Sequence, residues 1–114
     1  MLTATSDNVS SNYLGLSAFN GAVARLTTVN ISGTQQDGVW IEANSTVLFD
    51  APGNVVTGNG SAGASINDNS FAGFNFGNAN NRVSGNGQGD VVCYGHFSAA
   101  QGAGTVGGST NCPN

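Results

Sequence analysis

The sequence predicts an all-β protein folded as a parallel β-helix, in which the chain winds into stacked coils of short strands. Nearly half of the 114 residues are Gly, Asn, Ser or Thr, small residues that favour turns. A short motif of one apolar, one hydroxyl and one turn residue recurs at spacings of 22, 25 and 27 residues, the range in which repeats form solenoids. No segment has a helical periodicity long enough to compete with short strands.

The first strand of each coil follows from the recurring motif. Its leading apolar residue is expected to point inward and the hydroxyl residue outward, because side chains alternate along a strand. The copies are Val9-Ser10-Ser11-Asn12, Ile31-Ser32-Gly33-Thr34, Val56-Thr57-Gly58-Asn59 and Val83-Ser84-Gly85-Asn86.

The second strand lies eight to ten residues after each motif. Apolar residues stand there in pairs with a period of two, which indicates a strand with one buried face. The pairs are Val39 and Ile41, Ala64 and Ile66, and Val91 and Cys93.

The third strand precedes the next motif by seven to nine residues. The pairs are Ala22 and Ala24, Val47 and Phe49, and Phe74 and Phe76. This register predicts inward columns that join Val47 to Phe74 and Phe49 to Phe76. The apolar pairs keep a constant distance from the motif before them or from the motif after them, while the spacing between motifs grows. The extra residues are therefore expected in one turn, between about Asn69 and Phe71.

Asparagines are expected to stack in ladders between coils. One ladder follows the first strand and the other follows the second, where Asn tolerates left-handed backbone and pairs amide to amide with its neighbour. The first comprises Asn12, Thr34, Asn59 and Asn86, and the second comprises Asn44 and Asn69, with His96 in the same register.

The repeated motifs, together with Asp90-Val91-Val92-Cys93 and the closing Thr105 to Pro113, resemble the C-terminal coils of secreted right-handed parallel β-helix repeat proteins of the pectate-lyase-like superfamily. The resemblance implies a right-handed β-solenoid of about four to five coils with three short strands per coil. It also implies an extracellular or cell-surface location, in bacteria or on phage. That superfamily hosts lyases, hydrolases, epimerases, tailspikes and adhesins, so the resemblance specifies a fold more than a function.

The two ends of the chain are expected to differ. Residues 1–97 are interpreted as coils, and residues 98–114 as a Gly-rich cap tied down by a disulfide between Cys93 and Cys112, with two free buried thiols as the alternative. The N-terminus enters its first coil at Asp7 without a capping segment, which leaves unpaired strand edges.

Few residues suggest chemistry. The six acids do not recur at one coil position, and neither His96 nor the cysteines show metal-ligand spacing. The prediction is therefore that the chain is not an enzyme and uses no cofactor or metal. A net charge of -4 without any Lys disfavours nucleic-acid binding, and no apolar run approaches the ~20 residues of a membrane span.

One outward face is a candidate binding surface. Residues at alternate positions of the second strand place the only Trp near one of two Tyr. Aromatic rings with polar neighbours suit stacking on sugar rings; the alternative is that protein covers this face. The candidate residues are Trp40, Glu42, Ser65, Asn67 and Tyr94.

These observations favour a non-catalytic extracellular β-solenoid module that acts as a structural, fibre-forming or adhesive unit. The alternatives are the C-terminal part of a polysaccharide-active β-helix, either lyase-like or hydrolase-like, and a carbohydrate-binding module. The expected partners are another copy stacked on the open end, upstream β-helix coils, or polysaccharide. Head-to-tail stacking of copies predicts a filament.

Overall fold

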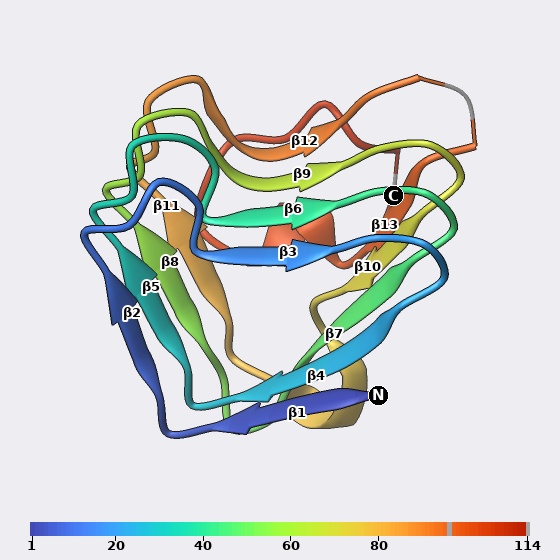
Figure 1. Ribbon diagram of the computed structural model, residues 1–114. Helices are drawn as coiled ribbons and strands as arrows, with labels where there is room; N and C mark the ends of the chain where they lie inside the picture. The colour runs from blue at the N-terminus through green and yellow to red at the C-terminus, as the bar shows by residue number, and fades with distance from the viewer. Residues whose placement is uncertain (96, 114) are drawn as a thin grey trace.

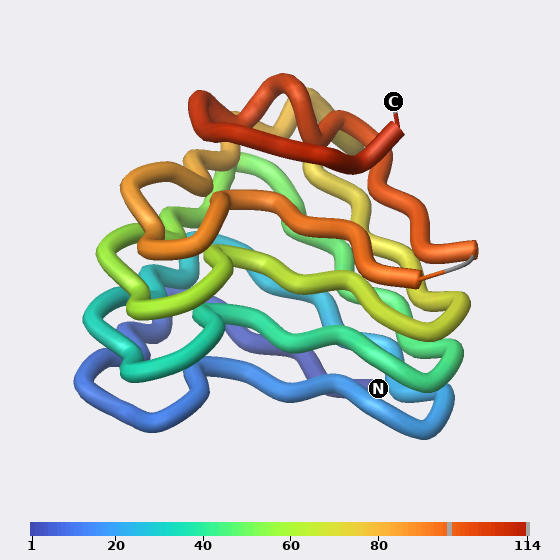
Figure 2. Tube along the Cα trace, turned by 90° about the horizontal axis from the view of Figure 1, so that it is seen from above, coloured from blue at the N-terminus to red at the C-terminus, as the bar shows by residue number. Residues whose placement is uncertain are grey.

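The computed structural model describes residues 1–95 and 97–113, and in them the chain forms a β-solenoid of about four turns. Viewed along the coil axis, the parallel sheets form the sides of a triangular prism (Figure 1). The chain runs clockwise as it recedes from the viewer, and the coils stack in sequence order (Figure 2), which makes the solenoid right-handed as predicted.

Within the described residues the strands belong to three sheets, in which every pairing is parallel. Sheet A contains β1 (Leu2–Thr5), β4 (Val23–Thr27), β7 (Thr46–Asp50), β10 (Phe71–Gly73) and β13 (Ala99–Gln101). Sheet B contains β2 (Asn8–Ser10), β5 (Asn30–Ser32), β8 (Val55–Thr57) and β11 (Arg82–Ser84). Sheet C contains β3 (Leu16–Ala18), β6 (Val39–Ile41), β9 (Ala62–Ile66) and β12 (Gly89–Cys93). Two short 3₁₀ helices in the same residues are η1 (Phe76–Asn78) and η2 (Ala103–Thr105).

The registers predicted for sheets B and C are confirmed. Val9, Ile31, Val56 and Val83 stand opposite one another in sheet B. In sheet C, Val39, Ala64 and Val91 form one column, and Ile41, Ile66 and Cys93 form the next.

The register predicted for sheet A is wrong by two residues. Val47 pairs with Ala24 and Ala72, not with Ala22 and Phe74. Phe49 instead packs on Phe74, with ring centroids 4.5 Å apart. A shift of two residues keeps every side chain on the same face of a strand, so alternation in the sequence cannot detect it.

The insertion is also misplaced by the sequence prediction. The turn from sheet C to sheet A has the same length in both middle coils, from Ile41 to Val47 and from Ile66 to Ala72. The turn from sheet A to sheet B grows instead, and its longest version contains η1. Phe76 therefore lies outside the core, with 39% of its surface exposed.

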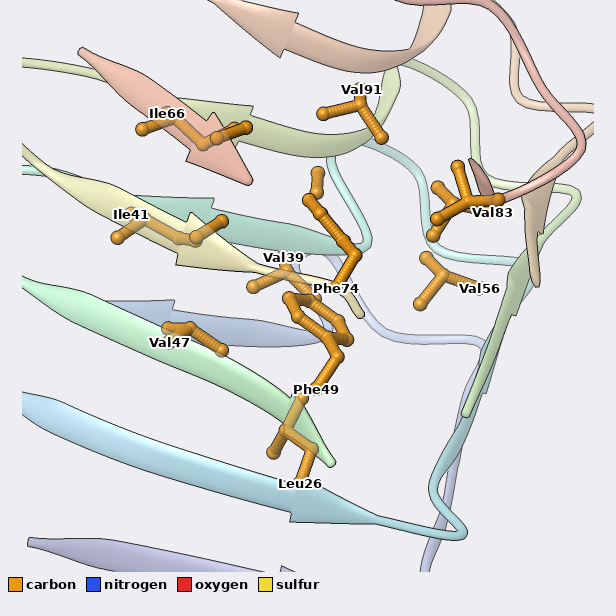
Figure 3. Packing of buried hydrophobic residues seen from close by; sticks show 14 of the residues in the cluster. Leu26, Val39, Ile41, Val47, Phe49, Val56, Ile66, Phe74, Val83 and Val91 are labelled. Atoms are coloured by element: carbon orange, nitrogen blue, oxygen red, sulfur yellow. The ribbon is translucent and has the colours of Figure 1, made fainter. Parts of the chain in front are cut away.

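The core lies inside the prism, and Figure 3 shows its buried side chains converging from the surrounding strands. Phe49 and Phe74 are its largest fully buried side chains, and branched aliphatic residues from sheets B and C surround them. This packing fixes the positions of the outward-facing side chains on each sheet.

The C-terminal end of the prism is covered. After β13 extends sheet A, the tail crosses the last coil (Figure 2), and its Ala103 and Val106 are buried against the core. The Cys93–Cys112 disulfide predicted from the sequence is confirmed, and it ties the tail to β12.

The N-terminal end is open. Strands β1, β2 and β3 each form the last strand at one edge of their sheets, and they lie together at one end of the prism (Figure 1). Ala4, Val9 and Leu16, which point inward there, are only partly buried.

Candidate functional site

The candidate binding surface lies on the outer face of sheet C. Trp40 of β6 stands between Ser17 of β3 and Ser65 of β9, and Val92 follows in β12. Trp40 is half-buried, whereas Ser65 is only 2% exposed. Trp40 is therefore the more accessible of these two residues.

The flanking residues Glu42, Asn67 and Tyr94 each follow a sheet C strand. The amide of Asn67 donates to the carbonyl of Ile41, and the amide of Tyr94 donates to the carbonyl of Ile66, so the three residues lie in successive coils. Tyr94 is 45% exposed. It lies two coils from Trp40, roughly 10 Å along the axis at ~4.8 Å per coil. The structure thus brings the predicted residues onto one face, with the two aromatic residues separated by the coil of Ser65 and Asn67.

Asp37 is a neighbour of this face that the sequence analysis did not single out. Its Oδ2 accepts a hydrogen bond from Ser65 Oγ at 2.9 Å, and its Oδ1 accepts one from the Ala62 amide at 2.8 Å. Asn67 Nδ2 in turn donates to the Ile41 carbonyl at 3.3 Å. These polar groups are satisfied within the protein, which assigns them a structural role in holding coils together.

Trp40 carries a donor without an acceptor. Its Nε1 is buried, and no hydrogen-bond partner is found for it in the part of the chain that the structure describes. A buried indole N–H normally finds an acceptor. This makes Trp40 the most distinctive polar group of the face.

The first predicted ladder forms from Thr34 through Asn59 to Asn86, which are buried or partly buried, whereas Asn12 of the first coil is exposed. Thr34 N and Oγ1 donate to Asn59 Oδ1 at 3.0 and 2.9 Å. Asn59 Nδ2 donates to Asn86 Oδ1 at 2.9 Å. The left-handed residue in these turns precedes the ladder position, contrary to expectation, and is Gly33, Gly58 or Gly85.

The second ladder is confirmed between Asn69 Nδ2 and Asn44 Oδ1, both with left-handed backbone. His96 lies outside the described residues. A third ladder was missed: Asn54 N and Nδ2 donate to the buried Asn81 Oδ1 at 2.8 and 3.0 Å. Its signal in the sequence was an Asn two positions before two of the recurring motifs.

Asp90 ends the first ladder. Its Oδ1 accepts from Asn86 N and Nδ2, and its Oδ2 accepts from Ser109 N and Oγ. Burial opposes its ionisation, but the hydrogen bonds from Ser109 and Asn86 outweigh burial and lower the pKa of Asp90 below its ordinary value. Asp90 is therefore a buried carboxylate used as an acceptor for the tail.

The remaining charges are dispersed. Arg25 Nε donates to Asp50 Oδ2 at 2.8 Å on the outer face of sheet A, and this hydrogen bond, aided by the charge of Asp50, raises the pKa of Arg25. Among residues 1–95 and 97–113, no three His, Cys, Asp or Glu side chains gather where they could hold a metal ion.

The N-terminal end is the second candidate site. It contains a cavity of about 120 Å³, lined by residues that include Leu2, Leu16, Ala22 and Val23. Leu2 and Val23 are 50% and 40% exposed, and Met1 beside them is 85% exposed. Apolar side chains and unpaired strand edges therefore coincide at this end, a combination typical of an interaction surface.

Comparison of the chain with models of known protein families, with curated proteins and with solved structures finds no match. None of the described helices has the length and apolar character needed to cross a membrane.

Proposed function

We propose that this chain is a non-catalytic structural module of the pectate-lyase-like β-helix superfamily, which acts outside the cell, on bacteria or phage, by assembling through its N-terminal end. The observation that carries the proposal is the difference between the two ends. The C-terminal end is covered by the chain's own tail, whereas β1, β2 and β3 leave one edge of every sheet unpaired. The Cys93–Cys112 disulfide supports the extracellular location, because such bonds persist in oxidising compartments.

A solenoid end of this kind is suited to receive more β-strands. Added strands would satisfy the outward amides and carbonyls of the first coil and would bury its partly exposed core. The same property serves a spacer, a fibre subunit or an adhesive platform, and it needs no catalytic group.

The test is to add one coil. A second copy of residues 24–46, placed directly before Leu2, continues the register of sheet A, because Leu2 and Val47 both pair with Ala24. We expect the added coil to fold on the open end and to slow hydrogen exchange at the amides of Thr3, Ser10 and Ser17. The control carries the same added residues in scrambled order. The proposal would be refuted if exchange at these amides were unchanged and if protease still cleaved the added coil of unscrambled sequence.

Polysaccharide binding on the Trp40 face is a second candidate function. It is favoured by the half-buried ring of Trp40 and the exposed Tyr94 on the same face. Titration of acidic and neutral oligosaccharides against Trp fluorescence tests it, with Trp40→Phe as a blank and Tyr94→Ala as the affinity variant. Saturable binding that Tyr94→Ala weakens supports this function, and absence of any saturable change rejects it.

A further inference from the structure

We propose that the partner of the open N-terminal end is a second copy of this chain, bound head to head about a two-fold axis. This inference rests on the proposed function, because it names the partner that the open end receives. It replaces the filament expected from the sequence with a closed dimer.

Head-to-tail stacking is opposed by the C-terminal end. In the last coil, the amide of Val83 already donates to the carbonyl of Val106, and the amide of Val91 donates to the carbonyl of Ser109, both at 3.0 Å. The tail thus occupies the positions that the first coil of another copy would need. With the C-terminal end covered, a copy that pairs with the open end must use its own identical end, which gives an isologous contact that closes at two subunits.

The open end presents its hydrogen-bonding groups in a regular pattern. Ser6 N donates to Thr27 O, and Leu16 N donates to Gly38 O, so the even-numbered residues of β1 and β3 face the second coil. In β2 the odd-numbered residues do so, because Asp7 O accepts from Asn30 N. Backbone groups alternate in direction along a strand. The residues whose amides and carbonyls turn to the open end are therefore Thr3, Thr5, Asn8, Ser10 and Ser17.

The triangular cross-section accommodates a two-fold axis. β1, β2 and β3 form the three sides of the open end (Figure 1). Consider a two-fold axis in the plane of the open end, through the middle of β1 and the corner between β2 and β3. This axis places β1 antiparallel to β1 of the copy, and it places β2 of each copy against β3 of the other. β2 and β3 are both three residues long, so their lengths match. One coil also supplies about the 20–30 residues a side found in interfaces of standard size.

The chemistry of this end suits a copy of itself. Strands β1, β2 and β3, with sequences LTAT, NVS and LSA, contain no charge and no Pro that would block pairing. Met1, Leu2 and Val23 are exposed apolar residues that the contact would cover. Asp7 lies at the corner between β1 and β2, and the two-fold axis sets it against the corner of Phe19 in the copy, away from the other Asp7.

The main test is a cysteine placed in β1 of the full chain, with the native disulfide intact. Only the head-to-head arrangement brings β1 against its own copy, so Thr3→Cys is expected to form a covalent dimer under mild oxidation. Thr46→Cys, on the same face of sheet A but in an inner coil, is the control and is expected to form none. Light scattering of the wild-type chain over a concentration series is expected to show monomer and dimer without larger species.

A second pair of variants tests strand pairing. Thr3→Pro removes an outward amide that has no partner among the described residues, so it is expected to weaken dimerisation at least tenfold, whereas Thr3→Ala keeps this amide and is expected to weaken dimerisation far less. Ser17→Pro provides the same test on β3 if Thr3→Pro does not fold by circular dichroism. Association that continues beyond the dimer, without Thr3 crosslinks, would overturn the head-to-head arrangement and leave the proposed function standing. A strictly monomeric chain would also overturn it, and the added-coil experiment then decides the proposed function separately.

Discussion

The register of sheet A can be tested by comparing two phenylalanines that differ by two positions. Phe74 is fully buried and stacked on Phe49, whereas Phe76 is 39% exposed and follows Phe74 into the turn. The sequence prediction assigned both to the core. Replacing each with Ala therefore separates the predicted register from the observed one.

The magnitudes follow from burial. Phe74→Ala is expected to lower the free energy of unfolding by about 3–5 kcal/mol, because it removes a buried ring and leaves a cavity between coils. The ring of Phe76 lies over Gly73 and is tilted against the ring of Phe71, with the two ring centroids 6.4 Å apart. Its partial burial gives an expected loss of about 1 kcal/mol for Phe76→Ala.

Urea unfolding followed by circular dichroism measures both losses, and the midpoint is compared at an unchanged m-value. A loss for Phe76→Ala equal to or larger than that for Phe74→Ala would refute the register described above. Two small losses would refute the view that the aromatic pair is central to the core.

Three further predictions concern the polar and covalent links between coils. Asn59→Ala is expected to cost about 1–3 kcal/mol, because it orphans the buried Thr34 amide, whereas Asn69→Ala in the exposed ladder is expected to cost about 0.5 kcal/mol or less; urea unfolding of both variants checks this. The pKa of Asp90 is below its ordinary value of 3.8 in the folded protein, so its contribution to stability is present above that value and is lost as pH falls through the lowered pKa. Unfolding at pH 7 and pH 3 is therefore expected to show less loss of stability in acid for Asp90→Asn than for the wild-type chain. Cys112→Ser is expected to cost roughly 3 kcal/mol by chain-entropy reasoning and to speed hydrogen exchange at Val106, measured by mass spectrometry.

The fold could be predicted because sheet B carries an unambiguous marker. In sheet B the turn that follows Val56 and Val83 contains Gly and Asn at fixed positions, so the strands align in one register only. Sheet A has no such marker, and its apolar residues recur every second position both in Val47 to Phe49 and in Phe74 to Phe76. Side-chain volume selects the register of sheet A. The inward position beside Val47 is filled by the small Ala72, and the ring of Phe74 fits on that of Phe49.

The candidate sites were predictable to different degrees. The outward column of Trp40 and Ser65 followed from the register of sheet C. The contact between Ser65 and Asp37 did not, because it depends on how the turn after Thr34 folds back toward the next coil. The open end followed from the absence of a capping pattern before Asp7, but the direction of each backbone group required the hydrogen bonds of the second coil.

The difference between the two ends is also encoded in the ladder that runs along the prism. Asn59 accepts from Thr34 of the preceding coil and donates to Asn86 of the following one, and Asn86 donates within its own coil to a final group that only accepts, an ionised carboxylate. Asp90 supplies it at a position that is glycine in the inner coils, where a Cβ on Gly38 or Gly63 would lie 2.6 or 2.5 Å from a valine methyl of the next coil. A side chain at this position therefore leaves no room for another coil of the same kind, and Gly108 of the tail fits against Asp90 instead. Sheets B and C stop at the coil of Asp90 for a steric and an electrostatic reason, and in the first coil Gly15 keeps the glycine of the inner coils, so growth of the stack is blocked at one end and left free at the other.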